Sequence, residues 1–262
     1  MWNLFINFSL GFYLTALIGG TIHLVTKNRR FNLFFLIAIS TGLVSNISAV
    51  FIRWLVAGYS PMSNMYETLI CLSAILVGIF IYLNTKQSIP LVGILVAFFA
   101  VTIMVLTNLF DRSIHSLSPA LKSNWLTVHV LLCMTGYAAL TISFISGLTI
   151  LLKPNKPVRT ETISASFKIT YESVKLGFFF LTLGILTGAV WAEQTWGTYW
   201  SWDPKESWAL ITWLIFAVYL HGQRLLNWSP RRLSWITVAG FGAMLFTYFG
   251  VSFILTGLHT YA

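Results

Sequence analysis

Long apolar runs separated by short polar segments dominate this chain. A helix needs roughly 20 predominantly apolar residues to cross the hydrocarbon core of a bilayer, and eight runs in the sequence come close to that length. They cover residues 3–26, 32–52, 65–84, 89–108, 126–152, 174–192, 207–226 and 234–256. The longest polar stretches between the runs are 109–124 and 153–173. The pattern predicts an all-α polytopic membrane protein with about eight transmembrane helices, forming a single membrane domain over residues 1–262.

The composition agrees with this class of protein. Hydrophobic residues make up 57% of the chain and charged residues 9%, whereas about a quarter of the residues in a soluble domain are charged. The formal net charge of +9 would suit an anionic partner. The basic residues lie in short loops, however, so nucleic acid binding is not expected.

The basic residues are divided unequally between the two sets of connections. Twelve lie in or next to the connections after the first, third, fifth and seventh runs: Lys27, Arg29, Arg30, Lys86, Lys153, Lys156, Arg159, Lys168, Lys175, Arg224, Arg231 and Arg232. Four lie on the other side: Arg53, Arg112, Lys122 and Lys205. Because cytoplasmic loops carry an excess of Lys and Arg, this bias predicts that the first set is cytoplasmic and that both termini lie outside.

Six of the eleven tryptophans are concentrated in residues 191–213: Trp191, Trp196, Trp200, Trp202, Trp208 and Trp213. Four of them belong to the string WGTYWSWDPKESW. Indole rings at this density suit a large planar ligand or a membrane interface. The same segment contains Glu193, Asp203, Lys205 and Glu206, which favours a planar ligand with ionised edges. The predicted topology places this segment in the external loop between the sixth and seventh helices.

Two histidines are predicted to lie at the same depth as the tryptophans. Ionisable residues in or near a membrane are costly and often functional. His129 lies near the outer end of the fifth run, and His259 lies just beyond the outer end of the eighth. A pair of neutral imidazoles is a common way to hold haem iron. The alternative is that each histidine caps a helix end at the interface.

Two further histidines are predicted to lie near the cytoplasmic side. His221 follows Ser207 by fourteen residues on the seventh run, which corresponds to about 21 Å along a helix. His23 lies toward the inner end of the first run, beside the small residues Ala16, Gly19 and Gly20. That small face admits a close neighbour or a flat ligand. His23 and His221 are therefore candidates for an inner site, with ordinary helix packing as the alternative for His23.

The remaining candidates are interpreted as structural. His115 lies in an outer loop beside Asp111 and Arg112, where we expect it to be solvated. Cys71 and Cys133 lie within apolar runs and do not form a C-x-x-C motif. We interpret them as small hydrophobic residues without thiol chemistry.

The residues that carry these features resemble a known family. The string WGTYWSWDPKESWALITW and the YLH sequence at 219–221 resemble the WWD signature of the CcsA/ResC haem-handling proteins of system II cytochrome c biogenesis. Related system I proteins share the WG-x-x-W-x-WD core but continue differently after the aspartate. The resemblance extends from Trp125 through VHV (128–130) to GLH (257–259), whereas the first four runs match only in hydropathy.

The resemblance implies a function for the membrane domain. It implies a subunit of a cytochrome c haem lyase (synthase) that moves haem b from the cytoplasmic side to an external site and supports its covalent attachment to apocytochrome c. The expected membrane is a bacterial inner membrane or a thylakoid membrane. The implied partners are a CcsB/ResB/Ccs1-type membrane protein and an apocytochrome with a C-x-x-C-H segment, with thiol-reducing proteins as further candidates.

The resemblance also implies roles for individual residues. His129 and His259 resemble the two external axial ligands, and His221 resembles one ligand of an intramembrane haem. The family usually credits the second inner ligand to the partner, and His23 is the candidate within this chain. Lys205 is a candidate partner for a haem propionate or an ordinary interfacial lysine. Asp203 orients the turn, binds an indole N–H group, or caps the seventh helix ahead of Pro204.

Two other function classes stay open at this point. A haem exporter or haem chaperone without attachment activity would use the same sites and release its cargo. Formation of a thioether product would distinguish it from a synthase. A helical permease that does not bind haem would explain the apolar runs but would leave the tryptophan cluster without a use, and the absence of a haem absorption band would support it.

Overall fold

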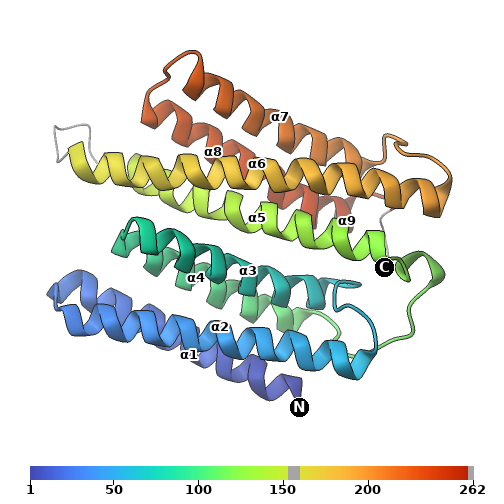
Figure 1. Cartoon of the computed structure of the whole chain (residues 1–262), viewed down its shortest axis with the longest axis horizontal. Coiled ribbons are helices and arrows are strands. Elements are labelled where there is room, and N and C mark those ends of the chain that lie inside the picture. The colour runs from blue at the N-terminus through green and yellow to red at the C-terminus, as the bar shows by residue number, and fades with distance from the viewer. Residues whose placement is uncertain (153–159, 259–262) are drawn as a thin grey trace. The chain divides into compact units, whose positions relative to one another are not determined.

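The computed structural model describes residues 1–152 and 160–258 and is helical throughout its regular parts. Eight helices of sixteen or more residues follow one another in the described residues (Figure 1): α1 (Trp2–Thr26), α2 (Arg29–Ala57), α3 (Met65–Lys86), α4 (Pro90–Leu106), α5 (Asn124–Leu151), α6 (Thr160–Trp196), α7 (Pro204–Arg224) and α8 (Pro230–Leu245). Shorter turns complete the chain: η1 (Thr107–Leu109), η2 (Pro119–Leu121), the π-helical η3 (Phe246–Gly250) and α9 (Val251–Ile254). The prediction of an all-α polytopic protein is confirmed.

Seven of these helices are long and apolar enough to cross a membrane by length and composition. The eighth, α7, is long enough at 21 residues but is less apolar than the others. Charged and polar side chains at its two ends, in the sequences PKES and HGQR, account for this difference. The predicted count of about eight spans, the positions of the termini and the cytoplasmic side stay predictions.

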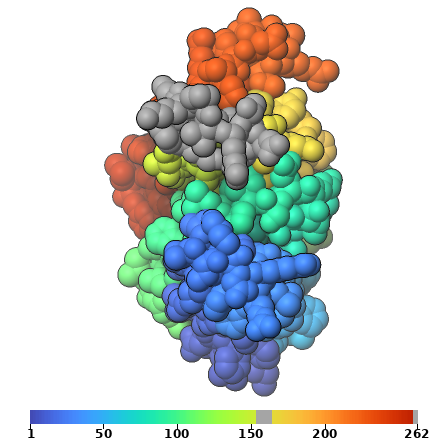
Figure 2. Space-filling view, turned by 90° about the vertical axis from the view of Figure 1, so that its left-hand side faces the viewer, coloured from blue at the N-terminus to red at the C-terminus, as the bar shows by residue number. Residues whose placement is uncertain are grey.

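The chain forms two compact units, a first unit of Met1–Leu117 and a second unit of Ser118–Ala262. We describe each by itself, and the single membrane domain stays a prediction. In the first unit, α1 contacts α2 and α4, and α3 contacts α2 and α4, so the four helices form a bundle. Figure 2 looks onto the end of this unit where the α1–α2 and α3–α4 connections lie.

The small residues beside His23 accommodate neighbouring helices of the first unit. A Cβ atom on Gly19 would lie 2.6 Å from the Phe34 ring, and a Cβ atom on Gly20 would lie 3.0 Å from the Phe35 ring. These two glycines therefore allow α2 to approach α1 closely. The space that we considered for a flat ligand is occupied here by phenylalanine rings.

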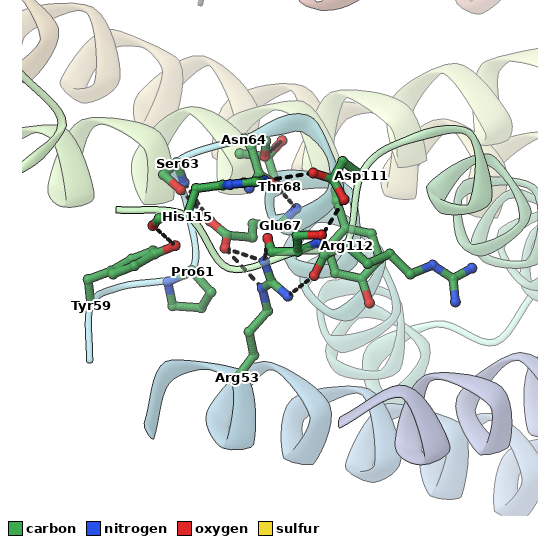
Figure 3. Close-up of polar contacts among 12 residues, drawn as sticks. Arg53, Tyr59, Pro61, Ser63, Asn64, Glu67, Thr68, Asp111, Arg112 and His115 are labelled. Carbon is green, nitrogen blue, oxygen red and sulfur yellow. Dashed lines mark hydrogen bonds and ion pairs between the residues drawn. The ribbon is translucent and has the colours of Figure 1, made fainter. Parts of the chain in front are cut away.

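A buried ion pair fixes the opposite end of the first unit (Figure 3). The Arg53 and Glu67 side chains are both fully buried and lie 2.9 Å apart. The remaining donors of Arg53 bind the carbonyl oxygens of Arg112 and Ser113 at 2.8 and 3.1 Å. The second carboxylate oxygen of Glu67 accepts hydrogen bonds from the backbone and hydroxyl of Ser63 at 2.9 and 2.7 Å. Together these contacts hold the α2–α3 loop and the segment after η1 against the bundle.

The second unit is also a bundle, in which α5 packs on α6 and α8, and α7 packs on α6 and α8. Helix α6 differs from the sequence expectation, because residues 160–173 are helical rather than part of a polar connection. Hydroxyl groups explain this: Thr149 of α5 donates to Ser166 at 3.0 Å, and Thr170 donates to Ser146 at 2.9 Å. These two hydroxyl pairs satisfy part of the polar face of this segment between the two helices. Of the basic residues assigned to this connection, Lys153, Lys156 and Arg159 lie outside the described residues.

Candidate functional site

Several predicted site residues lie together at one end of the second unit, defined here as the α6–α7 end. The start of α5, the end of α6, the start of α7 and the end of α9 all lie there (Figure 1). The His129 ring is parallel to the Trp191 ring, with 6.3 Å between centroids and 11° between planes. Lys205 Nζ lies 3.4 Å from Ser252 Oγ. His129 therefore lies beside the first tryptophan of the tryptophan-rich segment, and its role as a ligand stays a prediction.

The imidazole of His129 has a defined hydrogen bond. Its Nδ1 atom lies 2.7 Å from the carbonyl oxygen of Gly184 on α6. A carbonyl oxygen can only accept, so Nδ1 carries the proton and Nε2 is the basic nitrogen. In the described residues no hydrogen bond to Nε2 is found. The Sγ atom of Cys133 lies 3.7 Å from Nδ1, so this cysteine is a neighbour of the site.

The six tryptophans have two different environments. Trp191 is 1% exposed, and its indole N–H donates to the Ala120 carbonyl at 3.0 Å. Trp196 packs edge-on against it, with 4.8 Å between centroids. Farther along α7, Trp208 packs on Phe246, and Trp213 stacks on Phe178 while donating to Thr182. Three of the six tryptophans, Trp191, Trp208 and Trp213, therefore join separate elements.

Only two of the tryptophans lie in the loop itself. Helix α6 ends at Trp196 and α7 begins at Pro204, so the connection is confined to residues 197–203. Trp200 and Trp202 are perpendicular, with 5.7 Å between centroids. Trp202 is 70% exposed and has a backbone φ of 60°. The open aromatic surface is thus smaller than the sequence suggested, and Trp202 is its most exposed member.

A capping box fixes the end of this loop. The Asp203 side chain accepts a hydrogen bond from the Lys205 N–H at 2.9 Å, and the Glu206 side chain accepts one from the Asp203 N–H at 3.1 Å. Glu206 also accepts from the Ser201 N–H at 2.9 Å. Of the roles considered for Asp203, capping of α7 ahead of Pro204 is confirmed.

Asp203 has a second structural partner. Its other carboxylate oxygen accepts a hydrogen bond from the Leu258 N–H at 2.7 Å. A Cβ atom on Gly257 would lie 3.1 Å from Pro204 Cδ, so a glycine permits this close approach. The segment directly before His259 therefore lies against the start of α7, while His259 itself lies outside the described residues.

The other predicted histidines lie elsewhere. His221 is exposed on the last turn of α7, and its Nδ1 atom lies 2.9 Å from the Ala217 carbonyl oxygen. His23 belongs to the first unit, where its Nδ1 atom lies 3.0 Å from the Asn28 carbonyl oxygen. No inner site between these two histidines is described, because they lie in different units.

His115 is solvated, as expected. It forms an ion pair with Asp111 at 2.7 Å, and its side chain is 70% exposed. This hydrogen bond, followed by one from the Ser113 N–H, holds the pKa of the Asp111 carboxyl well below its usual range. Cys71 is buried and has no disulfide partner among the described residues.

Sequence reasoning missed four contributors to the α6–α7 end: Gly184, Cys133, Phe246 and Ser252. Gly184, Phe246 and Ser252 contact a site residue from a distant part of the chain, whereas Cys133 follows His129 by four residues on α5. The sequence held a signal for Cys133, which shares a helix face with His129, and for Gly184, which precedes Gly188 by four residues in an apolar helix. That spacing of small residues is typical of close helix packing in membranes.

This chain is similar to known proteins of cytochrome c assembly. The family described as cytochrome C assembly protein matches residues 62–259. The cytochrome c biogenesis protein CcsA of Guillardia theta is 38% identical over 237 residues, covering 80% of this chain and 79% of that protein. CcsA of Pyropia yezoensis is 33% identical over 314 residues, covering 100% and 97%. The chain belongs to the CcsA family of cytochrome c assembly proteins.

A solved structure supports the fold of this CcsA-family protein. The protein named cytochrome c heme lyase CcmF superposes with a TM-score of 0.77 at 17% sequence identity. The match covers 95% of this chain and 46% of that chain, so this chain spans about half the length of CcmF. At this identity the likeness shows the fold alone. Family membership and seven apolar helices make the chain an integral membrane protein of cytochrome c biogenesis.

Proposed function

We propose that this CcsA-family protein is the membrane subunit of a cytochrome c synthase, which holds haem at the α6–α7 end and supports its attachment to apocytochrome c. The observation that carries the proposal is the state of His129. Its Nδ1–H group is bound to Gly184 at 2.7 Å, which leaves Nε2 as the ligating nitrogen of a neutral imidazole. A ring nitrogen fixed in this way is typical of metal-binding histidines.

The donor set suits haem better than a bare metal ion. Among the described residues, no group of three or more His, Cys, Asp or Glu is placed to hold an ion. Haem iron needs only axial ligands from the protein because the macrocycle supplies the other four donors. His129 is one such ligand. His259 is the proposed second ligand, and its neighbour Leu258 is bound to Asp203.

The surroundings of His129 suit the other parts of the macrocycle. The exposed Trp202 ring offers a flat apolar surface, and the Lys205 ammonium lies at the start of α7, 3.4 Å from Ser252 Oγ. We assign Lys205 to a propionate of the substrate. We assign Asp203 to holding the loop and the Leu258 segment, since its oxygens accept backbone hydrogen bonds from Lys205 and Leu258.

Attachment requires little chemistry from this chain. Each thioether forms when a thiol of the apocytochrome C-x-x-C-H segment adds across a haem vinyl group. The chain contributes by fixing the iron through imidazoles and by covering one face of the substrate with indole, so that an edge with the vinyl groups faces the apocytochrome. A nucleophile or catalytic acid within the chain is not required, and thiol-reducing proteins would keep the acceptor cysteines reduced.

We propose a second haem position near His221 as the loading step. His221 lies at the opposite end of α7 from the loop, about 21 Å away along the helix. Its ring is exposed, and its Nδ1–H group donates to Ala217, so Nε2 is again the basic nitrogen. A CcsB-type membrane partner is the proposed source of the second ligand, with His23 as the candidate within this chain. The proposed cargo is haem b, loaded from the cytoplasmic side of a bacterial inner or thylakoid membrane.

Spectroscopy of single variants tests the proposal. The complex with the CcsB-type partner is purified, and haem absorption and cytochrome c yield are measured. His129→Ala and His259→Ala should each deplete haem at the α6–α7 end by roughly tenfold or more and abolish maturation. His115→Ala is the matched control and should change neither. Normal maturation in both ligand variants would refute the ligand assignment.

The route between the two positions has its own test. His221→Ala should deplete haem at the α6–α7 end although His129 and the tryptophans are intact. His23→Ala identifies the second inner ligand, because loss of inner haem would assign it to this chain. Reporters at Lys153, Ser201 and Ala262 test sidedness, with the first expected to be cytoplasmic and the others external. Haem release without thioether product would indicate an exporter.

A further inference from the structure

We propose that Gly188, together with Gly184, is a positioning residue that seats the His129 imidazole in the orientation needed to ligate haem. This inference rests on the proposed function, since it assigns a role to residues around the same ligand. The two glycines lie one helical turn apart on α6. Neither touches the proposed substrate, and both act through His129.

The seat is part of a regular contact between α5 and α6. Gly177 lies against Leu140, and a Cβ atom there would come within 2.6 Å of the leucine side chain. One step farther along the antiparallel pair, a Cβ atom on Gly136 would lie 3.0 Å from the backbone nitrogen of Leu181. Because these glycines carry no side chain, α5 and α6 can approach each other closely.

The glycine contacts between α5 and α6 continue to the α6–α7 end, where the glycines face Cys133 and His129 instead of leucines. A Cβ atom on Gly184 would lie 2.6 Å from Cys133 Sγ, and one on Gly188 would lie 2.6 Å from both Cε1 and Nδ1 of His129. The gap left by Gly188 is therefore filled by an imidazole edge, where the earlier gap is filled by a leucine. At Gly188 the same kind of close glycine contact therefore supports the proposed ligand His129 instead of a leucine.

Three contacts define where the imidazole lies. Gly188 limits the approach of the Cε1–Nδ1 edge, the Gly184 carbonyl binds Nδ1–H, and the Trp191 ring lies parallel to the imidazole plane. Because Cε1 is bonded to both ring nitrogens, a displacement at Cε1 also moves Nε2. A methyl group at position 188 would therefore shift or rotate the proposed ligating atom while leaving every ligand in the sequence.

Gly188→Ala tests this inference against Gly177→Ala. Both substitutions place a methyl group 2.6 Å from a side chain of α5, and the methyl group at position 177 would also lie 3.1 Å from the Gly136 carbonyl oxygen. The control therefore disturbs helix packing at least as much as Gly188→Ala. The partner complex is purified, and the low-spin haem spectrum and the reduction potential are measured. Gly188→Ala should alter both and weaken haem retention by roughly 10- to 100-fold, the range for groups that support a metal ligand. Gly177→Ala should leave the spectrum and the potential unchanged.

A double variant separates the seat from general folding. If Gly188→Ala fails to fold, His129→Ala combined with Gly188→Ala should fold again, because the ring that the methyl group strikes is gone. The effects of the two single substitutions on haem retention should be strongly non-additive. Additive effects, or a double variant that fails to fold while His129→Ala folds, would overturn the inference.

The outcomes also separate this inference from the proposed function. If His129→Ala leaves haem at the α6–α7 end unchanged, the proposed function fails. If His129→Ala removes that haem but Gly188→Ala has the spectrum and potential of Gly177→Ala, only the positioning role fails.

Discussion

The two units each hold polar groups among apolar helices, but they do so in opposite ways. In the first unit, Arg53 and Glu67 direct their side-chain hydrogen bonds to one another and to nearby groups of the chain. In the described part of the second unit, His129 forms hydrogen bonds through Nδ1 alone, and Lys205 Nζ has one long hydrogen bond, to Ser252 at 3.4 Å. Trp202 is mostly exposed.

The difference indicates where a ligand is expected. A closed network has no donor or acceptor left to offer, and its effect is to fix loops and helix ends. An open network retains a basic nitrogen, an ammonium group and an aromatic face. The first arrangement is typical of structural stabilisation, and the second is typical of a binding site.

Breaking the closed network should have the largest effect on folding. Glu67→Gln removes the negative charge beside Arg53 and leaves a buried guanidinium without a counter-charge. Removing one partner of a buried ion pair typically destabilises by about 3–5 kcal/mol, so the thermal unfolding temperature in detergent should fall strongly.

The matched control for this change is Glu172→Gln. Glu172 pairs with Lys175 at 2.8 Å, but both side chains are nearly half exposed. Exposed pairs contribute at most about 1 kcal/mol. Equal unfolding temperatures for the two variants would contradict the structural role of Arg53 and Glu67.

Trp191 and Trp202 should separate stability from haem retention. Trp191→Ala removes a buried ring and an indole donor, and truncations of this kind typically cost about 3–5 kcal/mol. Trp202→Ala removes an exposed ring and should leave the unfolding temperature almost unchanged while weakening haem retention. The large loss of folding free energy that is typical of truncating a buried aromatic residue is therefore expected for Trp191 and not for Trp202. A destabilised Trp202→Ala variant would contradict the open character of the loop.

Asp203 should show an intermediate effect. Asp203→Ala removes the cap of α7, which typically costs about 1 kcal/mol, and also frees the Leu258 N–H group. Amide exchange at Leu258 should accelerate, and haem retention should fall. Asn64→Ala is the control, since Asn64 caps α3 through a 2.9 Å bond to the Glu67 N–H and belongs to the closed region. Its cost in stability should be similar, without a change in haem.

His115→Ala should have the smallest effect of the series. The side chain is solvated and pairs only with an exposed carboxylate. Both the unfolding temperature and cytochrome c yield should remain within error of the unchanged protein. A loss of yield would mean that the segment after η1 takes part in maturation.

The sequence predicts the helices well because apolar length is a local property. It also predicts that His129 lies level with the tryptophans, since helix rise converts residue number into depth. The cap at Asp203 is recognisable from the following proline and from Glu206. These features depend on neighbours within one or two helical turns.

The features that sequence reasoning misses depend on distant partners. The polar segment at residues 164–173 of α6 packs on α5 through hydroxyl pairs at Ser166 and Thr170. The seat of His129 pairs residues more than fifty positions apart, and the Arg53–Glu67 pair involves carbonyl groups beyond residue 110. Composition along one segment carries no information about such partners.

The backbone of Trp202 has a consequence for how this loop can evolve. A residue other than glycine at a φ of 60° lies in the left-handed region, which costs of order 1–3 kcal/mol. Glycine would relax the backbone, so Trp202→Gly should unfold at a higher temperature than Trp202→Ala. Selection for stability alone would thus favour loss of this indole. A tryptophan at this position indicates a stability–activity trade-off, in which a strained backbone is retained because the ring that it presents is useful.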